Sequence, residues 1–189
     1  MPPKKQYTKK EIIEAGFELA RTEGIEGISI RKVAKKLGSS IAPIYVNFDT
    51  VEELKKAVVE KVFELSKELY PKSEEPSSLD IGIASLRFAK EYSAIFRDLV
   101  MKENDYMKAY DSNLEILVEE MKDYPELKEF TKEEIKKMLF KMRVFQLGLS
   151  VMAANGLFTE EPDEEELIEM LESAGDDVLL AMHWRKKHQ

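Results

Sequence analysis

Apolar residues recur at helical spacing along most of this 189-residue chain. Near the amino terminus one such stretch follows Thr8 and ends at Gly24, which predicts a helix over about 9–23. A shorter stretch lies between Ser29 and Gly38, and a brief apolar segment, IAPIYVNF, follows it. Serine favours helix starts and glycine favours helix ends, so the first fifty residues predict three helices, the last about two turns long.

The same spacing continues beyond residue 50. A long helix is predicted from Thr50 to about residue 70, where Pro71 stops it, and PKSEEPSS predicts a loop over 71–78. No segment alternates apolar and polar residues as a strand does, so the predicted class is all-α, with an N-terminal three-helix helix-turn-helix domain and a larger helical bundle. The bundle helices are expected at about 79–91, 93–102, 105–123, 132–155 and 164–183.

Helix starts are also marked by a Thr or Asp that is followed three residues later by Glu. The first side chain can accept a hydrogen bond from a free backbone N–H of the first turn, and the glutamate can accept one in return. Carboxylates are further favoured near the positive end of the helix dipole. Four pairs of this kind precede apolar-periodic runs: Thr8/Glu11, Thr50/Glu53, Thr131/Glu134 and Asp163/Glu166.

Charge is distributed unevenly along the chain, whose formal net charge is −8. Residues 1–50 hold nine Lys and Arg against six Asp and Glu, a charge of +3, so the remainder carries −11. This asymmetry favours a basic module that docks on phosphate and an acidic module that stays off it, although solvation alone would give the same pattern. The charge therefore permits a nucleic-acid partner for the first module.

Composition excludes several function classes. The chain has no cysteine, which removes disulfides, thiol catalysis and thiolate metal sites. Its histidines are His183 and His188, and it has no HExxH motif or glycine-rich phosphate loop, so no catalytic residue, metal site or cofactor is predicted. No stretch reaches the roughly 18 apolar residues that span a bilayer, and the start lacks an apolar signal-peptide core. We expect a cytoplasmic protein with no membrane partner.

The first three predicted helices carry a family motif. Across about residues 8–58 the chain resembles the DNA-binding signature of the TetR family, a three-helix domain whose last helix enters the major groove. The resemblance implies that the Tyr45 hydroxyl meets phosphate and that Phe48 packs in the small core. The alternative is that both aromatics are core residues. The residues that match the family pattern are Gly24, Ile25, Val33, Ala34, Gly38, Tyr45 and Phe48.

The chain departs from the family pattern at three positions. Pro43 stands where the family often has Thr, Val51 stands where it often has Lys, and Asn47 stands where His is frequent. Two common phosphate contacts are therefore missing. We expect the neighbouring Lys55 and Lys56, or the basic start of the chain, to supply replacement charge.

Side-chain chemistry divides the expected DNA contacts into two groups. Hydroxyl, amide and small apolar groups suit base edges and methyls, whereas cations and tyrosine suit phosphates. The alternative for the cations is the solvated face of an amphipathic helix. Base contacts are expected from Ser39, Ser40, Ile41, Ala42 and Asn47, and phosphate contacts from Ser29, Arg31, Lys35, Lys36 and Tyr45, with Lys4 and Lys5 as a mobile arm.

The larger domain contains candidates for a small-molecule site. Most methionines lie beyond residue 100, with aromatics interleaved, which favours an adaptable apolar interior. The resemblance implies a pocket for an apolar or amphipathic effector, and the alternative for each candidate is an ordinary bundle core. The candidates are Phe88, Tyr92, Phe96, Tyr106, Tyr110, Met142, Phe145 and Gln146.

The last two predicted helices each carry a long apolar stripe. The first runs from Ile135 through Met142, Phe145 and Leu149 to Met152, and the second runs over residues 167–182. The resemblance implies that these helices pair with those of a second copy, and such a homodimer requires a roughly palindromic operator.

Together these features predict a ligand-responsive regulator, a repressor that leaves double-stranded operator DNA when its effector binds. Residues 1–50 would form the DNA-binding domain, 51–70 a connecting helix, and 71–189 the ligand-binding and dimerisation domain. The rival interpretation is a helical DNA-binding or protein-interaction module that binds no small molecule. An all-helical enzyme with a buried active site is a more distant rival.

Overall fold

The computed structural model describes residues 7–71, 78–107, 118–119, 121–122 and 124–188, and the statements below concern those residues. They form helices and turns and no strand, which confirms the predicted all-α class. The chain divides into two compact units. The first contains residues 1–68 and 91–107, and the second contains residues 69–90 and 108–189. Each unit has its own set of buried apolar residues.

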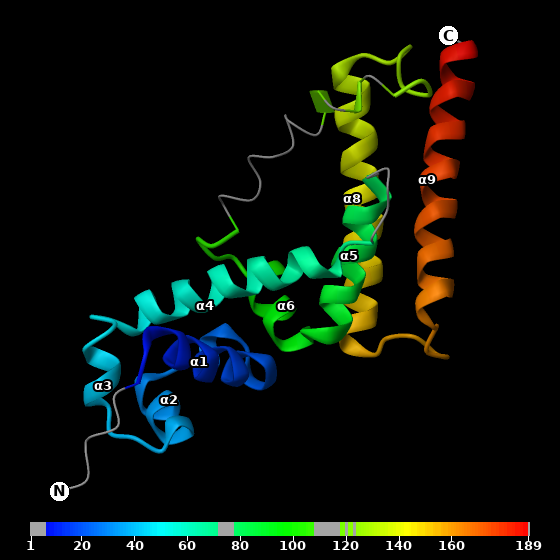
Figure 1. Ribbon diagram of the computed structural model, residues 1–189. Helices are drawn as coiled ribbons and strands as arrows, with labels where there is room; N and C mark the ends of the chain where they lie inside the picture. The colour runs from blue at the N-terminus through cyan, green and yellow to red at the C-terminus, as the bar shows by residue number, and fades with distance from the viewer. Residues whose placement is uncertain (1–6, 72–77, 108–117, 120, 123, 189) are drawn as a thin grey trace, which may run out of the picture. The chain divides into compact units, whose positions relative to one another are not determined.

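The first unit contains the predicted amino-terminal helices (Figure 1). Its helices are α1 (Lys9–Glu23), α2 (Ile30–Leu37), α3 (Ala42–Tyr45), α4 (Val51–Ser66) and α6 (Ser93–Val100). A short 3-10 helix, η1 (Ile25–Gly27), joins α1 to α2, and another, η2 (Lys67–Leu69), follows α4. α1 packs against α2, α4 and α6, which confirms the three-helix helix-turn-helix at the amino terminus. The core of this unit includes Ile12, Val33, Ile44, Leu54 and Val58, all inaccessible to solvent.

Side-chain caps begin the helices largely as predicted. Reciprocal capping boxes are present at Thr8, Thr131 and Asp163. At Thr50 the hydroxyl accepts from the N–H of Glu53 at 3.1 Å, as expected. The Glu53 carboxylate, however, accepts from the backbone N–H of Asp49 at 2.9 Å. The prediction of a reciprocal bond at this helix is therefore wrong, because the Glu53 carboxylate bonds to the backbone of Asp49 and not to that of Thr50.

The third helix is shorter than the sequence predicts. It spans one turn, Ala42–Tyr45, instead of about two. The side-chain amide of Asn47 donates to the carbonyl oxygen of Pro43 at 2.9 Å. In a longer helix that carbonyl would bond to the backbone N–H of Asn47, which donates instead to Ile44 at 2.9 Å. The asparagine side chain thus takes the place of the next helical hydrogen bond and ends α3.

The stretch after α6 forms turns. Residues 101–107 are not helical, so the helix predicted over 105–123 is wrong at its start, and most of the remainder lies outside the described residues. Asn104 explains this end. Its amide donates to the carbonyls of Leu99 and Lys102, both at 2.8 Å, and its Oδ1 accepts from the N–H of Met107 at 3.1 Å. One side chain therefore caps α6 and holds the turn.

The second unit is built on long helices. α5 (Ser78–Glu91) has all but its last residue in this unit, and α8 (Lys132–Asn155) and α9 (Glu164–Lys187) lie side by side and antiparallel (Figure 1). Leu86 of α5, Leu149 of α8, and Leu167 and Leu171 of α9 form one buried cluster. A second cluster gathers residues of 118–139 around Met182. Over the part of the chain described, no helix combines the length and apolar character that crossing a membrane requires.

The apolar stripe predicted on α8 is correct only in part. Ile135, Met138, Leu139 and Leu149 are buried, but Phe145 and Met152 are exposed. A helix that is apolar on more than one side leaves the choice of buried face open from spacing alone. Burial by α5 and α9 makes the choice here, and it leaves Phe145 outside.

Candidate nucleic-acid interface

The second helix presents a basic outer face. α2 begins at Ser29, whose Oγ accepts a hydrogen bond from the N–H of Lys32 at 3.3 Å. Ile30, Val33 and Ala34 are buried on its inner side. Because side chains on a helix return to the same face every 3.6 residues, the basic residues between these buried positions face water. The exposed cations of the helix are Arg31, Lys32, Lys35 and Lys36.

Within the described part of the chain, one of these four cations is paired with a carboxylate and three are not. Among the described residues, Arg31, Lys35 and Lys36 form no ion pair, whereas Lys32 bonds to Glu23. A cation that is not neutralised by a neighbouring carboxylate retains its attraction for phosphate. The outer face of α2 is therefore suited to a polyanionic backbone.

The third helix is anchored by two buried side chains and exposes the rest. Ile44 and Phe48 are buried, and they fix α3 against the core of the unit. Tyr45 is 50% exposed, and its hydroxyl makes no hydrogen bond within the described part of the chain. Ile41 and Ala42 are exposed as well, so this short helix offers apolar groups and one phenol to a partner.

Val46 was missed by the sequence analysis. It directly follows α3 and is 85% exposed, an unusual position for a valine. The signal was present in the pattern: Ile44 and Phe48 lie four residues apart and share the buried side, so a residue midway between them points away. Val46 therefore adds a third exposed side chain to Ile41 and Tyr45 in this segment.

Some predicted DNA contacts are engaged inside the protein. The amide of Asn47 donates to the carbonyls of Pro43, at 2.9 Å, and Tyr7, at 3.4 Å. Ser39 Oγ donates to the carbonyl of Ser40 at 2.9 Å. Ser40 itself is exposed. Lys4 and Lys5 lie outside the described residues.

Lys55 does not supply the replacement charge that the sequence suggested. Its side chain is only 11% exposed, and its Nζ lies 2.7 Å from Oε2 of Glu26. The expectation for this lysine is therefore wrong, because an acid that is 29 residues earlier in the chain neutralises it. Lys56 is exposed, and it remains as a candidate.

The turn before α2 is held by a carboxylate from α6. Oδ2 of Asp98 accepts a hydrogen bond from the backbone N–H of Glu26 at 3.1 Å, and its Oδ1 bonds to Lys102 Nζ at 2.6 Å. Burial alone would raise the pKa of Asp98, but the bonds from Lys102 and from the backbone N–H groups of Glu26 and Ile25 outweigh it and hold the pKa below its usual value. Asp98 is therefore ionised at neutral pH.

Predicted effector contacts in the first unit serve its core. Phe96 is completely buried in α6. Tyr92 packs its ring against Phe17 with the centroids 5.9 Å apart, and burial, together with a hydrogen bond to Glu91, raises the pKa of Tyr92 to about 12. Tyr106 is half-buried in the turn after α6. Tyr110 lies outside the described residues.

The other predicted effector contacts belong to the second unit. Phe88 is half-buried on α5. On α8, the amide of Gln146 donates to Ser85 Oγ at 2.5 Å and to Ser150 Oγ at 3.3 Å. Met142 lies against Gly175 of α9, where an added Cβ would be 3.4 Å from its terminal methyl. The prediction thus grouped residues of two separate units, and only a subset of them shares one bundle.

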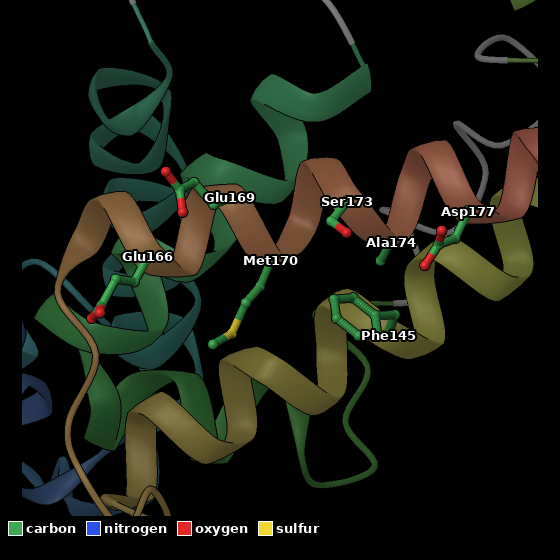
Figure 2. Close-up of a pocket in the computed structure, with 7 residues that line it drawn as sticks. All are labelled: Phe145, Glu166, Glu169, Met170, Ser173, Ala174 and Asp177. Carbon is green, nitrogen blue, oxygen red and sulfur yellow. The ribbon is translucent and has the colours of Figure 1, made fainter.

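Phe145 lines an open groove between α8 and α9. The groove has a volume of about 550 Å³. Figure 2 shows Phe145 of α8 and Met170 of α9 on its two sides, with acidic residues along α9. Phe145 and Met170 are its large apolar residues, and Glu166, Glu169 and Asp177 give it negative charge. The residues that line it are Phe145, Glu166, Glu169, Met170, Ser173, Ala174 and Asp177.

Comparison with known proteins supports the fold. No protein-family model matches the chain, and no curated protein sequence matches it. Among solved structures, the fatty acid degradation regulator FadR from Bacillus halodurans is similar, with a TM-score of 0.58 and 17% sequence identity. The match covers 93% of this chain and 97% of that chain. This chain therefore has the same overall helical fold as that regulator.

The Asp98 contact predicts a pH dependence of stability. A carboxyl group whose pKa is depressed on folding stabilises the protein above its unfolded pKa, and this stabilisation is lost as the pH falls through the folded pKa. Asp98→Asn should therefore be less stable than the wild type at pH 7, with a difference that shrinks toward about pH 3. Urea unfolding of both proteins across this range measures it. A difference that stays constant into acid would contradict the assignment, and Asp176→Asn, at an exposed site on α9, is the control.

Proposed function

We propose that the chain is a transcription regulator of the TetR type, which binds operator DNA through α2 and α3. The observation that carries this proposal is the exposed surface of these two helices. It combines the unneutralised cations Arg31, Lys35 and Lys36 with the exposed Tyr45. The resemblance over residues 8–58 and the shared fold with a solved regulator support it.

The two helices take different roles in this proposal. Phosphate contacts come from the cations of α2, from the Ser29 hydroxyl and from the Tyr45 hydroxyl, and they position the protein without reading sequence. Base contacts come from the exposed residues around α3. Apolar groups such as Ile41, Ala42 and Val46 suit thymine methyls, and Ser40 suits a base edge. Asn47 and Ser39 are proposed to contribute less to DNA binding, because their polar groups already bond within the domain.

The operator-binding form is proposed to be a homodimer through α8 and α9. Both helices expose large apolar side chains: Phe140 and Val144 lie four residues apart on α8, and Leu180 and Trp184 lie four residues apart on α9. Leu180 is 70% exposed and Trp184 is 61% exposed. Apolar stripes of this kind, on helices that already pack on each other, suit a second copy of the same pair. The TetR-like assignment supports the same arrangement.

An apolar or amphipathic effector is proposed to release the DNA, which makes the protein a repressor. The fold match to a protein named as a fatty acid degradation regulator supports an effector of this class. In the second unit, the group formed by Gln146, Ser85 and Ser150 offers polar atoms within an apolar bundle. An effector weakens operator binding only as far as it prefers the released conformation, typically by about 1–3 kcal/mol.

A DNA-binding module without an effector is the second candidate. Two observations favour it. Phe96 is fully buried and Gln146 bonds to neighbouring serines, so both residues already have structural roles. The residues that bind DNA would be the same in both candidates. A screen for small molecules that weaken binding to the selected operator separates the two.

DNA selection tests the proposed function. The wild-type protein, incubated with random duplexes, should enrich a palindromic sequence, whereas Tyr45→Ala should bind that sequence more weakly because it loses a phosphate contact. The matched control is Tyr124→Ala, an exposed tyrosine of the second unit, which should bind as the wild type does. Weak binding that enriches no sequence would contradict the proposal.

Sedimentation velocity tests the dimer. Leu180→Asp places a charge on the exposed apolar face of α9, and it should convert the dimer to a folded monomer because an unpaired buried charge is strongly unfavourable. Leu157→Asp makes the same change at an exposed leucine in the turn after α8 and should remain dimeric. A wild type that sediments as a monomer, or a Leu180→Asp protein that stays dimeric, would count against this interface.

A further inference from the structure

The short turn between α1 and α2 is held at Glu26 by side chains from two other helices, α6 and α4. The backbone N–H of Glu26 donates to Oδ2 of Asp98 on α6 at 3.1 Å. The side chain of Glu26 accepts from Nζ of Lys55 on α4 at 2.7 Å. Both partners are nearly buried, with 10% of the Asp98 side chain and 11% of the Lys55 side chain exposed. Charge-assisted bonds shielded from water are stronger than neutral, exposed ones.

The fit between α6 and this turn is close enough to require glycine. Gly24 has φ 79°, a backbone conformation that side chains rarely adopt. A Cβ at this position would lie 2.2 Å from Oδ2 of Asp98 and 3.2 Å from the carbonyl oxygen of Ala94. The glycine of the family motif is therefore explained by the approach of α6 as well as by its φ angle.

The turn controls where α2 begins. Only Gly27 and Ile28 separate Glu26 from Ser29, which caps α2. Ile25 and Ile28 are buried on either side of the bonded residue, so the segment has little freedom of its own. A shift of Glu26 would move Ser29 and the cations of α2 with it.

α6 is fixed in the first unit, and the stretch of chain that contains it continues into the second unit at both ends. Ala94, Ile95 and Leu99 are buried, and Asn104 caps the carboxyl end of the helix. Residues 91–107 belong to the first unit, whereas residues 69–90 before them and 108–189 after them belong to the second. The stretch that carries Asp98 therefore belongs to the first unit, although the chain before it and the chain after it belong to the second.

We propose that Asp98 is a positioning residue for DNA recognition, which sets the orientation of α2 by holding the backbone of Glu26. The inference rests on the proposed function. Asp98 touches no DNA in this arrangement, and Lys55 supports the same turn from the other side.

The experiment compares Asp98→Ala with Lys102→Ala. Lys102 bonds to the same carboxylate, at 2.6 Å from Oδ1, but it is exposed, and the oxygen that accepts from Glu26 is Oδ2. Affinity is measured for the selected operator and for a random duplex, at a temperature where circular dichroism shows each variant fully folded. Asp98→Ala should lose about tenfold or more in operator affinity and keep its affinity for random duplex, because the α2 cations remain. Lys102→Ala should bind both duplexes as the wild type does.

A purely structural role gives a different result. If Asp98 only stabilises the fold, Asp98→Ala melts at a lower temperature but binds the operator normally when folded, and the inference is overturned. Equal loss of affinity for both duplexes also overturns it, because positioning affects specific contacts. A wild-type protein that selects no duplex overturns the proposed function first, and the inference falls with it.

Amide exchange tests the geometry independently of DNA. Removing the acceptor should speed exchange of the Ile25 and Glu26 amides in Asp98→Ala, and Lys102→Ala should leave both rates unchanged. Unchanged exchange in Asp98→Ala would overturn the inference even if operator affinity falls.

Discussion

A helix of one turn has no stability of its own in water, so the position of α3 depends on burial of its side chains by the rest of the unit. Ile44 and Phe48 supply that burial. Because both point inward, Ile41, Tyr45 and Val46 are left on the surface at fixed positions. The exposed face of α3 is thus a consequence of how its core side is held, and the proposed reading of DNA depends on that anchor.

The charged residues of the first unit are also unevenly distributed. The chain is acidic overall, with a net charge of −8, yet α2 presents cations that no carboxylate in the described chain neutralises. Two lysines elsewhere in the unit are paired with carboxylates: Lys55 with Glu26 and Lys61 with Glu14. Ion pairs thus consolidate the interior side of the domain, while unpaired cations remain where phosphate would lie. An acidic second unit would then be repelled from the same polyanion, which favours one orientation of the protein on DNA.

Local signals in the sequence predicted the elements that local interactions form. The bounds of α1 and α2 followed from Thr8, Ser29 and the glycines after each helix, because caps act within one turn. The length of α3 was missed, since it depends on a side-chain bond from Asn47 to Pro43. On α8, spacing could not tell which apolar side is buried, so Phe145 was assigned inward although it is exposed.

The contacts that sequence analysis missed are long-range. Glu26 and Asp98 are 72 residues apart, and Glu26 and Lys55 are 29 apart, so no local pattern joins them. Lys55 was for this reason taken as a surface charge. Gly24 was recognised as a helix stop, but the close approach of α6 that also requires it needed the structure.

The salt dependence of operator binding tests the central claim, that the outer face of α2 meets the DNA backbone. Each phosphate contact releases counterions, so the slope of log affinity against log salt concentration should become shallower by about one for each of Lys35→Ala and Lys36→Ala. Lys128→Ala, an exposed lysine of the second unit, should leave the slope unchanged. If the slopes of Lys35→Ala and Lys36→Ala also match the wild type, α2 does not face phosphate and this account of the interface is wrong.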